Sequence, residues 1–247
     1  MEQYSPTNLG GAMSKLRCHI SISLDGFVAG PNQSEENPLG ERGERLHDWA
    51  VSLAAWRELH REQDGEVNES TRIMEETLEN VGAGLMGRNM FGPVGGGDWG
   101  DGHWKGWWGD DPPYHNDVFI LTHYPRDPVE MEGGTTFHFV TDGIERTLKL
   151  AREAANGRDV RLRGGARAIQ QYLAAGLLDE LELHVVPVLL GDGERLFDNL
   201  GHAEPQLEQV RAIDAPGVTH LKYRVRPRGN PGSAVAPLED GGRRIGS

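Results

Sequence analysis

Gly164 and Gly165 are the residues whose type and position most directly suggest ligand chemistry in this sequence. They separate a predicted strand from a predicted helix that begins at Ala166. Paired glycines let a backbone approach a ligand closely, and the free N–H groups of a first helical turn favour a phosphate. Arg163 and Arg167 add positive charge on either side. The pair fits neither the GxGxxG fingerprint nor a P-loop, so a plain tight turn is the other interpretation.

Two further strand ends carry groups of the same kind. They are Gly87, Arg88 and Asn89 after one predicted strand, and Thr122, His123 and Arg126 after another. An arginine holds a phosphate well because its planar fork donates two parallel hydrogen bonds. Each of these arginines alone is also typical of a protein surface. In a chain with a formal net charge of −13, their shared position at strand ends favours a small anionic ligand.

The elements that must position these groups follow from the spacing of apolar residues. Alternation and short apolar runs predict strands over 16–24, 85–86, 118–121, 137–140, 159–163 and 181–190. Helices are predicted over about 44–62, 67–80, 142–156 and 166–176. Residues 207–213 and 218–225 are typical of a closing antiparallel hairpin. Since strands alternating with helices need crossover connections, we predict an α/β fold with a largely parallel sheet.

Two of these elements carry more specific expectations. Cys18 falls on the apolar side of the first strand, so we expect it to be buried as a small hydrophobic residue. Asp142 stands where a helix N-cap belongs, and Glu145 follows three residues later. This spacing predicts a capping box, in which each side chain accepts a hydrogen bond from a backbone N–H group of the helix start.

Residues 82–109 have an unusual composition. They contain 11 of the glycines and four of the six tryptophans of the chain, so we predict an irregular loop. Exposing four indole rings would be unfavourable. Either Trp99, Trp104 and Trp107 wall a pocket for a flat ring, or the loop folds onto the core and simply buries its tryptophans.

Composition limits the class of protein. The 247 residues suit one domain over 15–226 with flexible tails at 1–14 and 227–247. Net negative charge argues against a nucleic-acid or anionic-membrane partner, and no apolar stretch is long enough to span a membrane. One cysteine, no signal-peptide pattern and no metal-binding histidine spacing predict a cytoplasmic protein without a metal site.

The content and order of five segments match one known superfamily: 23–29, 85–88, 118–123, 163–166 and 176–191. Together they resemble the dihydrofolate reductase superfamily, and more closely the reductase domain of bifunctional riboflavin-biosynthesis deaminase/reductases. The resemblance spans about 15–226, and no deaminase zinc motif is present. It implies an NADPH-dependent reductase with a mixed, mostly parallel central sheet flanked by helices.

The resemblance also implies roles for individual residues. The pyrophosphate of NADPH would be held by Gly164, Gly165, Ala166 and Arg167, with Arg163 beside them, and by Gly87, Arg88 and Asn89. The 2′-phosphate would be read by Thr122, His123 and Arg126. The nicotinamide would lie beside Val28, Ala29 and Gly30. These positions include the candidate anion sites inferred from the residues alone.

The chain departs from dihydrofolate reductases proper over 38–62, where no carboxylate matches their pterin-binding acid. The candidate proton donors are Asp25, for which a plain turn role is the alternative, and His47 or Asp48 beside Trp49. We expect Trp49 and the tryptophan loop to wall the substrate site.

We therefore expect hydride transfer to a C=N or C=O bond of a small flat heterocycle, pterin-like or pyrimidine-like. The alternatives are a dihydrofolate reductase, a 5-amino-6-(5-phosphoribosylamino)uracil reductase, and a non-catalytic nucleotide-binding protein. The resemblance also implies a homodimer.

Overall fold

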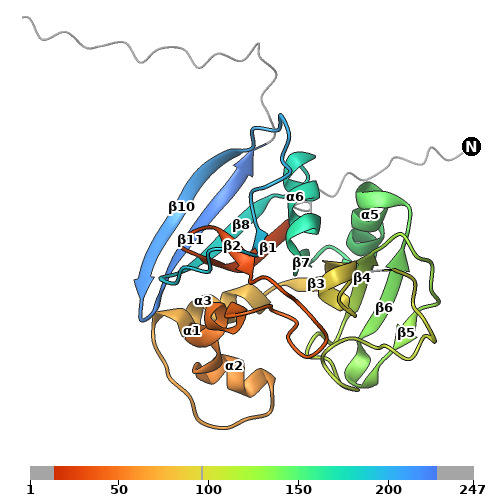
Figure 1. Cartoon of the computed structure of the whole chain (residues 1–247), viewed down its shortest axis with the longest axis horizontal. Helices are drawn as coiled ribbons and strands as arrows, with labels where there is room; N and C mark the ends of the chain where they lie inside the picture. The colour runs from red at the N-terminus through yellow and green to blue at the C-terminus, as the bar shows by residue number, and fades with distance from the viewer. Residues whose placement is uncertain (1–13, 96, 227–247) are drawn as a thin grey trace, which may run out of the picture.

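The computed structural model describes residues 14–95 and 97–226, which form a large sheet with helices on both faces (Figure 1). The tails expected at 1–14 and 227–247 lie outside the described residues, apart from Ser14. Nine strands make up the described sheet, in the spatial order β10 (Gln206–Ala215), β11 (Val218–Arg226), β8 (Glu180–Val186), β1 (Leu16–Ser23), β7 (Asp159–Leu162), β3 (Val81–Gly87), β4 (Asp117–Leu121), β6 (Thr136–Val140) and β5 (Val129–Glu130).

The central strands from β8 to β6 run parallel, whereas both edges of the sheet are antiparallel. The hairpin β10–β11 (blue in Figure 1) pairs with β8 at one edge, and β5 pairs with β6 at the other. A separate two-stranded sheet joins β2 (Phe27–Ala29) to β9 (Glu194–Arg195). The expected mixed, mostly parallel sheet with a C-terminal antiparallel hairpin is confirmed.

Helices cover the two faces of the sheet differently. One face carries α5 (Gly143–Ala155) and α6 (Ala166–Ala174), whose apolar side chains join the largest core cluster. The other elements are η1 (Gly43–His47), α1 (Asp48–Val51), α2 (Ala54–Leu59), α3 (Glu69–Leu78), α4 (Arg88–Phe91) and η2 (Glu132–Gly134). In Figure 1, α1, α2 and α3 lie together near one end of the sheet.

The period-two alternation of the strands decides what each face of the sheet presents. In β1, Leu16 and Cys18 join the core beneath α5 and α6, as expected for Cys18. Arg17, His19 and Ser21 are also buried but belong to the opposite face. The fully buried Tyr172 ties α6 to α5, because its hydroxyl donates to the carbonyl of Ile144 on α5.

The opposite face carries two separate apolar clusters. One lies over the β8 and β11 end and includes Trp49, Leu53 and Met74 from the helices. The other lies over β3, β4 and β6 and packs Phe91 with the tryptophan loop. Between them, β1 and β7 present polar side chains rather than apolar ones.

Several predictions of local structure differ from the structure in detail. The helix expected over 44–62 is broken into η1, α1 and α2, because Leu53 is extended and bridges to Glu66. The strand expected to reach Leu190 ends at Val186, since Pro187 has no N–H to donate to a neighbouring strand. Asp142 is the N-cap of α5, but its side chain makes no capping hydrogen bond, so the predicted capping box is wrong.

The irregular loop expected over 82–109 begins only after Phe91, because its first residues form β3 and α4. The glycines of β3 allow close packing that a side chain would block. A Cβ atom at Gly82 would lie 2.4 Å from the carbonyl oxygen of Ala155, and one at Gly84 would lie 2.8 Å from Nε of Arg163.

Within the described ranges, no helix is long and apolar enough to cross a membrane.

The core assignment predicts a contrast between two leucines. Leu162 is fully buried in the centre of the sheet, whereas the side chain of Leu189 is 63% exposed. We expect Leu162→Ala to lower the free energy of unfolding by about 2–5 kcal/mol in urea denaturation, because it removes buried contacts and leaves a cavity. Leu189→Ala, the matched control, should change it by less than about 0.5 kcal/mol. Equal losses in the two variants would contradict this core.

Candidate active site

A large cavity of about 1220 Å³ lies beside the carboxyl ends of β3, β4 and β7. Its other walls come from α1, α2, α3 and the loop that follows α4. Ligands of open α/β sheets bind at the carboxyl ends of strands. The volume exceeds the roughly 300–1,000 Å³ of a pocket for one drug-sized molecule, so it has room for an extended ligand or for two ligands.

Two of the predicted glycine turns meet at one end of this cavity. Gly165 is the N-cap of α6, and a Cβ atom there would meet nothing within 4 Å, so the first turn of the helix is open to the cavity. The Gly87 N–H donates to the Gly164 carbonyl at 2.7 Å. A Cβ atom at Gly87 would lie 3.2 Å from that of Ala168. The turns after β3 and β7 therefore pack directly against each other.

Arg88 is buried beside these turns. Its guanidinium lies over the ring of Trp99, 3.9 Å from the ring centre, and Nη1 donates to the carbonyls of Gly92 and Pro93. Its Nε and Nη2 atoms are buried and have no hydrogen-bond partner among the described residues. Buried donors of a cation without partners favour an anionic ligand.

Most of the residues predicted to hold a cofactor line this single cavity. They are Val28, Ala29, Gly87, Arg88, Asn89, Thr122, His123, Arg163, Gly164, Gly165, Ala166 and Arg167. Arg167 is exposed, and its side chain makes no hydrogen bond or ion pair within residues 14–95 and 97–226. The structure thus gathers strand ends that are far apart in the sequence into one surface rich in N–H donors.

Two predicted cofactor residues do not line the cavity. Arg126 donates to the carbonyls of Trp104 and Gly102, each at 2.7 Å, so its guanidinium fastens the tryptophan loop. Gly30 packs against the backbone of residue 41, where a Cβ atom would lie 2.0 Å from a carbonyl oxygen. Its glycine is needed for this close approach rather than for contact with the cavity.

The three candidate proton donors lie in different places. Asp25 is outside the cavity and accepts hydrogen bonds from the Ser23 hydroxyl and the N–H groups of Leu190 and Gly191. Partial burial opposes the effect of these bonds, but they hold the pKa of Asp25 below its ordinary value. A carboxylate with a lowered pKa is a poor proton donor, so the turn role fits it better.

His47 and Asp48 do line the cavity. Nδ1 of His47 is buried and has no partner among the described residues, so it is free to hydrogen-bond a ligand. Burial lowers the pKa of His47, against the opposing effect of the neighbouring Asp48 carboxylate.

The predicted aromatic wall is only partly formed. Trp49 and Trp107 line the cavity, whereas Trp99 and Trp104 do not. The indole N–H of Trp104 donates to Phe91 and that of Trp99 to Tyr124, both at carbonyl oxygens. Each of the two interpretations of the loop therefore describes some of its tryptophans.

The floor of the cavity is a set of residues that the sequence patterns did not single out: His19, Ser21, Tyr114, Arg161 and His184. The alternation of charged and apolar residues in β1, β7 and β8 could have indicated that these residues line a site. Charged residues on the second face of a central strand are unusual unless they line a site.

Hydrogen bonds and ion pairs organise this floor. Nδ1 of His19 lies 3.2 Å from a carboxylate oxygen of Glu182, which also pairs with Arg211. Burial lowers the pKa of His19 to about 4, although the Glu182 carboxylate opposes the shift. Burial alone would raise the pKa of Glu182, but the nearby His19 ring and the hydrogen-bonded Arg211 guanidinium bring it to about 2.

A histidine pair continues the floor toward α3. Nδ1 of His184 lies 2.8 Å from Nδ1 of His220, whose Nε2 lies 2.9 Å from the Ser70 hydroxyl. Trp49 packs on both rings and donates its N–H to Ser21 at 3.1 Å. Burial lowers the pKa of His184 well below its ordinary value, so this ring is neutral near pH 7.

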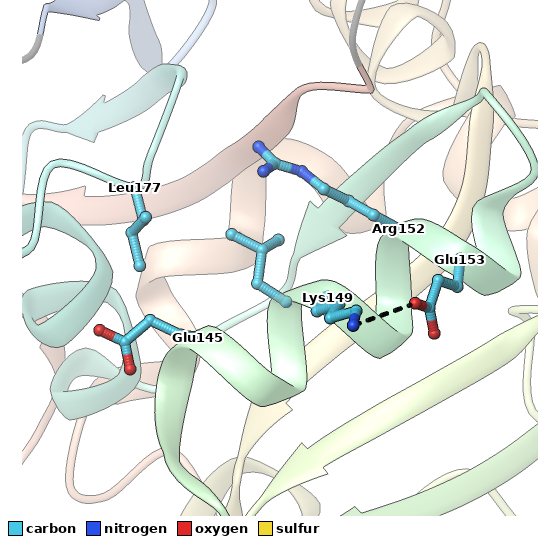
Figure 2. A pocket seen from close by; sticks show the side chains of 6 residues that line it. Glu145, Lys149, Arg152, Glu153 and Leu177 are labelled. Carbon is cyan, nitrogen blue, oxygen red and sulfur yellow. Dashed lines mark ion pairs between the residues drawn. The ribbon is translucent and has the colours of Figure 1, made fainter. Parts of the chain in front are cut away.

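A second hollow lies on the outer side of α5, between Glu145, Arg152 and Leu177 (Figure 2). Three of the charged side chains around it are paired: Lys149 lies 3.8 Å from Glu153, and Arg152 lies 3.3 Å from Asp179. It contains none of the strand-end groups, so the large cavity is the candidate site. No group of three or more metal-binding side chains occurs among the residues that the structure describes.

Comparison with known proteins identifies a family and relatives of this chain. The family described as the RibD C-terminal domain matches residues 14–220. The uncharacterized protein YyaP of Bacillus subtilis (strain 168) is 27% identical over 183 residues, which cover 72% of this chain and 77% of the relative. The crystal structure of a putative riboflavin biosynthesis protein from Shewanella sp. PV-4 has a TM-score of 0.56 and 21% identity, and the match covers 86% of this chain and 99% of that one.

The chain belongs to the RibD C-terminal domain family. The predicted resemblance to the reductase domain of riboflavin-biosynthesis enzymes is thereby confirmed at the level of the family.

The buried histidines predict loss of stability in acid. Unfolded histidines take up protons below their ordinary pKa of 6.5, whereas folded His19 excludes one until about pH 4, and His184 behaves similarly. Stability present above pH 6.5 is therefore lost as the pH falls, by up to about 1.4 kcal/mol per pH unit for each such histidine. Urea unfolding of the wild type at pH 7.5, 6.5 and 5.5 measures this slope.

His184→Asn keeps a donor near the Nδ1 position and removes the titrating ring, so we expect a shallower slope. His202→Asn, at an exposed site, is the matched control and should keep the wild-type slope. The same slope in His184→Asn as in the wild type would show that His184 does not titrate with unfolding.

Proposed function

We propose that this protein is an NADPH-dependent reductase that transfers a hydride to a C=N or C=O bond of a small flat heterocycle, pterin-like or pyrimidine-like. The observation that carries the proposal is the division of one cavity into two chemically different ends. One end presents glycine turns, an open helix start and two N–H donors of Arg88 that have no partner among the described residues. The other presents Trp49 and hydrogen-bonding side chains such as His47 and His184. The volume accommodates a dinucleotide and a substrate together.

The residues present fit a dinucleotide phosphate group. Three features support this: the open space at Gly165, the close approach of Gly87 to α6, and the partnerless Nε and Nη2 atoms of Arg88. Arg167 would add a further cation at the helix start. Thr122 and His123, at the end of β4, would contact the 2′-phosphate that distinguishes NADPH from NADH.

The bound cofactor would supply the hydride at its nicotinamide ring. The chain would orient the reactants: Val28 and Ala29 border the ring, and Trp49 and Trp107 stack against the flat substrate. The proton that completes the reduction would pass through Asp48 or His47, the two predicted candidates that line the cavity. The cavity walls would exclude water from the reacting atoms.

We further propose that residues 15–226 act as one domain, in the cytoplasm, as a homodimer. The ten-residue strand β10 is an edge of the described sheet and exposes Leu207 and Val210, which supports pairing with a second copy there.

Binding of NADPH and NADH, compared by isothermal titration and thermal shift, tests the cofactor. We expect NADPH to bind more tightly, and a hundredfold excess over its dissociation constant to stabilise the protein by about 2.7 kcal/mol. Arg167→Gln should lower the affinity for NADPH about tenfold, because the variant loses one charge-assisted hydrogen bond to the cofactor. Arg146→Gln, an equal charge change on the exposed surface of α5, is the control and should bind normally.

Oxidation of NADPH with pterin and pyrimidine acceptors, followed by absorbance, then separates a reductase from a protein that only binds the nucleotide. Equal affinity for NADPH in Arg167→Gln and the wild type would contradict the assignment of Arg167 to phosphate binding. Absence of binding to either nucleotide would overturn the proposed function.

A further inference from the structure

Two histidine rings and a serine hydroxyl form a buried chain of hydrogen bonds on the second face of the sheet. Nδ1 of His184 lies 2.8 Å from Nδ1 of His220, and Nε2 of His220 lies 2.9 Å from the hydroxyl oxygen of Ser70. All three residues are buried, and His184 also lines the cavity. The register of the sheet sets this order, because His184 on β8 is the direct neighbour of His220 on β11 and of Ser21 on β1.

Both rings of this chain are neutral near pH 7. Burial is the main cause that lowers the pKa of His220 below its ordinary value, as it is for His184. A neutral imidazole carries one proton, so one of its nitrogens donates a hydrogen bond and the other accepts one. Since the two Nδ1 atoms face each other, a single proton lies between them. The chain therefore has a direction, which is set at its far end.

Ser70 sets that direction. Its hydroxyl is buried, and Nε2 of His220 is its only hydrogen-bond partner among the described residues. A buried hydroxyl hydrogen without an acceptor costs free energy, so the Ser70 hydroxyl donates to Nε2 of His220. His220 then carries its own proton on Nδ1 and donates it to Nδ1 of His184. It follows that His184 carries its proton on Nε2.

The Nε2–H group of His184 is a donor in a fixed position on the cavity floor. Because Nδ1 is turned toward His220, Nε2 is the ring nitrogen left for a ligand. Trp49 holds the ring in place, since the two ring centres lie 4.8 Å apart and the indole N–H is tied to Ser21. The hydrogen bonds of a chain polarise one another, which strengthens the donor at its end.

His19, whose ring centre lies 6.3 Å from that of His184, presents the opposite group. Its Nδ1 lies 3.2 Å from the Glu182 carboxylate, which is ionised because its pKa is about 2. An ionised carboxylate only accepts hydrogen bonds, so His19 carries its proton on Nδ1 and has a lone pair on Nε2. Of these two neighbouring rings, His184 is therefore the donor.

We propose that His184 is a further catalytic residue, whose Nε2–H group donates a hydrogen bond to the nitrogen or oxygen atom of the double bond that is reduced. His220 and Ser70 are positioning residues, because they fix the proton of His184 on Nε2. The inference rests on the proposed reductase function and adds a residue to its mechanism.

The role of this donor follows from where charge develops. When a hydride reaches the carbon of a C=N or C=O bond, the electron pair of that bond moves to the nitrogen or oxygen. A donor already aimed at this atom stabilises the charge without reorganising during the reaction. His184 keeps its proton throughout, since the proton that completes the reduction arrives by the separate route proposed through Asp48 or His47.

The two amides that can replace a histidine test this role in the full-length protein. The shorter side chain of His184→Asn reaches only the Nδ1 position, so it keeps a partner for His220 and loses the donor in the cavity. The longer side chain of His184→Gln reaches the Nε2 position and keeps that donor. With the preferred acceptor, we expect kcat to fall about 10²-fold in His184→Asn and to stay within about tenfold of the wild type in His184→Gln. A merely structural role predicts that His184→Asn is the better tolerated variant.

Two controls accompany these variants. Isothermal titration should give the wild-type affinity for NADPH in both, because the donor acts on the substrate. His202→Gln, at an exposed site, should keep the wild-type kcat.

Nitrogen NMR of the histidine side chains is a second readout that needs no ligand. In the wild type at pH 7.5, we expect the proton of His184 on Nε2 and that of His220 on Nδ1. Each signal is assigned from its loss in the corresponding Gln variant. Ser70→Ala removes the donor that begins the chain, so both rings should become mixtures of two tautomers. In that variant kcat should fall, while the KM for NADPH stays unchanged.

The outcomes separate this proposal from the proposed function. A proton on Nδ1 of His184 in the wild type would overturn the proposal, whatever the kinetics show. Equal kcat in His184→Asn and the wild type, or a larger loss in His184→Gln, would overturn it and leave the reductase function standing. If the wild type has the expected tautomers and binds NADPH but reduces no acceptor, the reductase function falls, and the catalytic role of His184 falls with it.

Discussion

The polar second face of strands β1, β7 and β8 is the constraint on which the rest of this structure depends. On their first face, these strands present Leu16, Leu162 and Leu183 to a continuous core beneath α5 and α6. On their second face, they present charged and polar side chains that no apolar layer could cover without leaving hydrogen-bonding groups unsatisfied. The covering elements therefore divide into two apolar clusters, one on each side, and the cavity occupies the space between them. The cavity therefore exists because the central strands of the sheet present polar side chains on their second face.

The two ends of the cavity are built by different physical means. The end with the glycine turns uses backbone: Gly87 lets the turn after β3 approach α6 closely, and Gly165 leaves the first turn of α6 open to the cavity. The opposite end uses side chains whose directions are fixed by partners, such as Glu182 for His19 and Ser21 for Trp49. Backbone recognition suits a cofactor shared by many enzymes, whereas side-chain recognition suits a substrate particular to one.

Two arginines fasten the tryptophan loop in addition to its apolar contacts. Arg126 donates to two loop carbonyls and lies near the rings of Trp99 and Phe139. Arg88 also stacks on the ring of Trp99. A glycine-rich segment has a large conformational entropy to lose, and these contacts offset it. The loop is thereby fixed in a position where Trp107 and Trp108 reach the cavity.

The sequence by itself determined the elements whose causes are local. Alternation in β1, the glycine pair before α6, the left-handed Asn156 that ends α5 and the β10–β11 hairpin depend on neighbours along the chain, and all could be predicted. The order of the five motifs was enough to indicate the family. Only the tertiary structure decided that Arg126 fastens a loop, that Asp25 closes a turn and that Arg161 lies on a cavity floor. Those roles depend on pairing between strands that are distant in the sequence. β1 pairs with β7 and with β8, although more than a hundred residues separate β1 from either strand. A side chain's partners across such pairings follow from the register of the sheet, which no local pattern specifies.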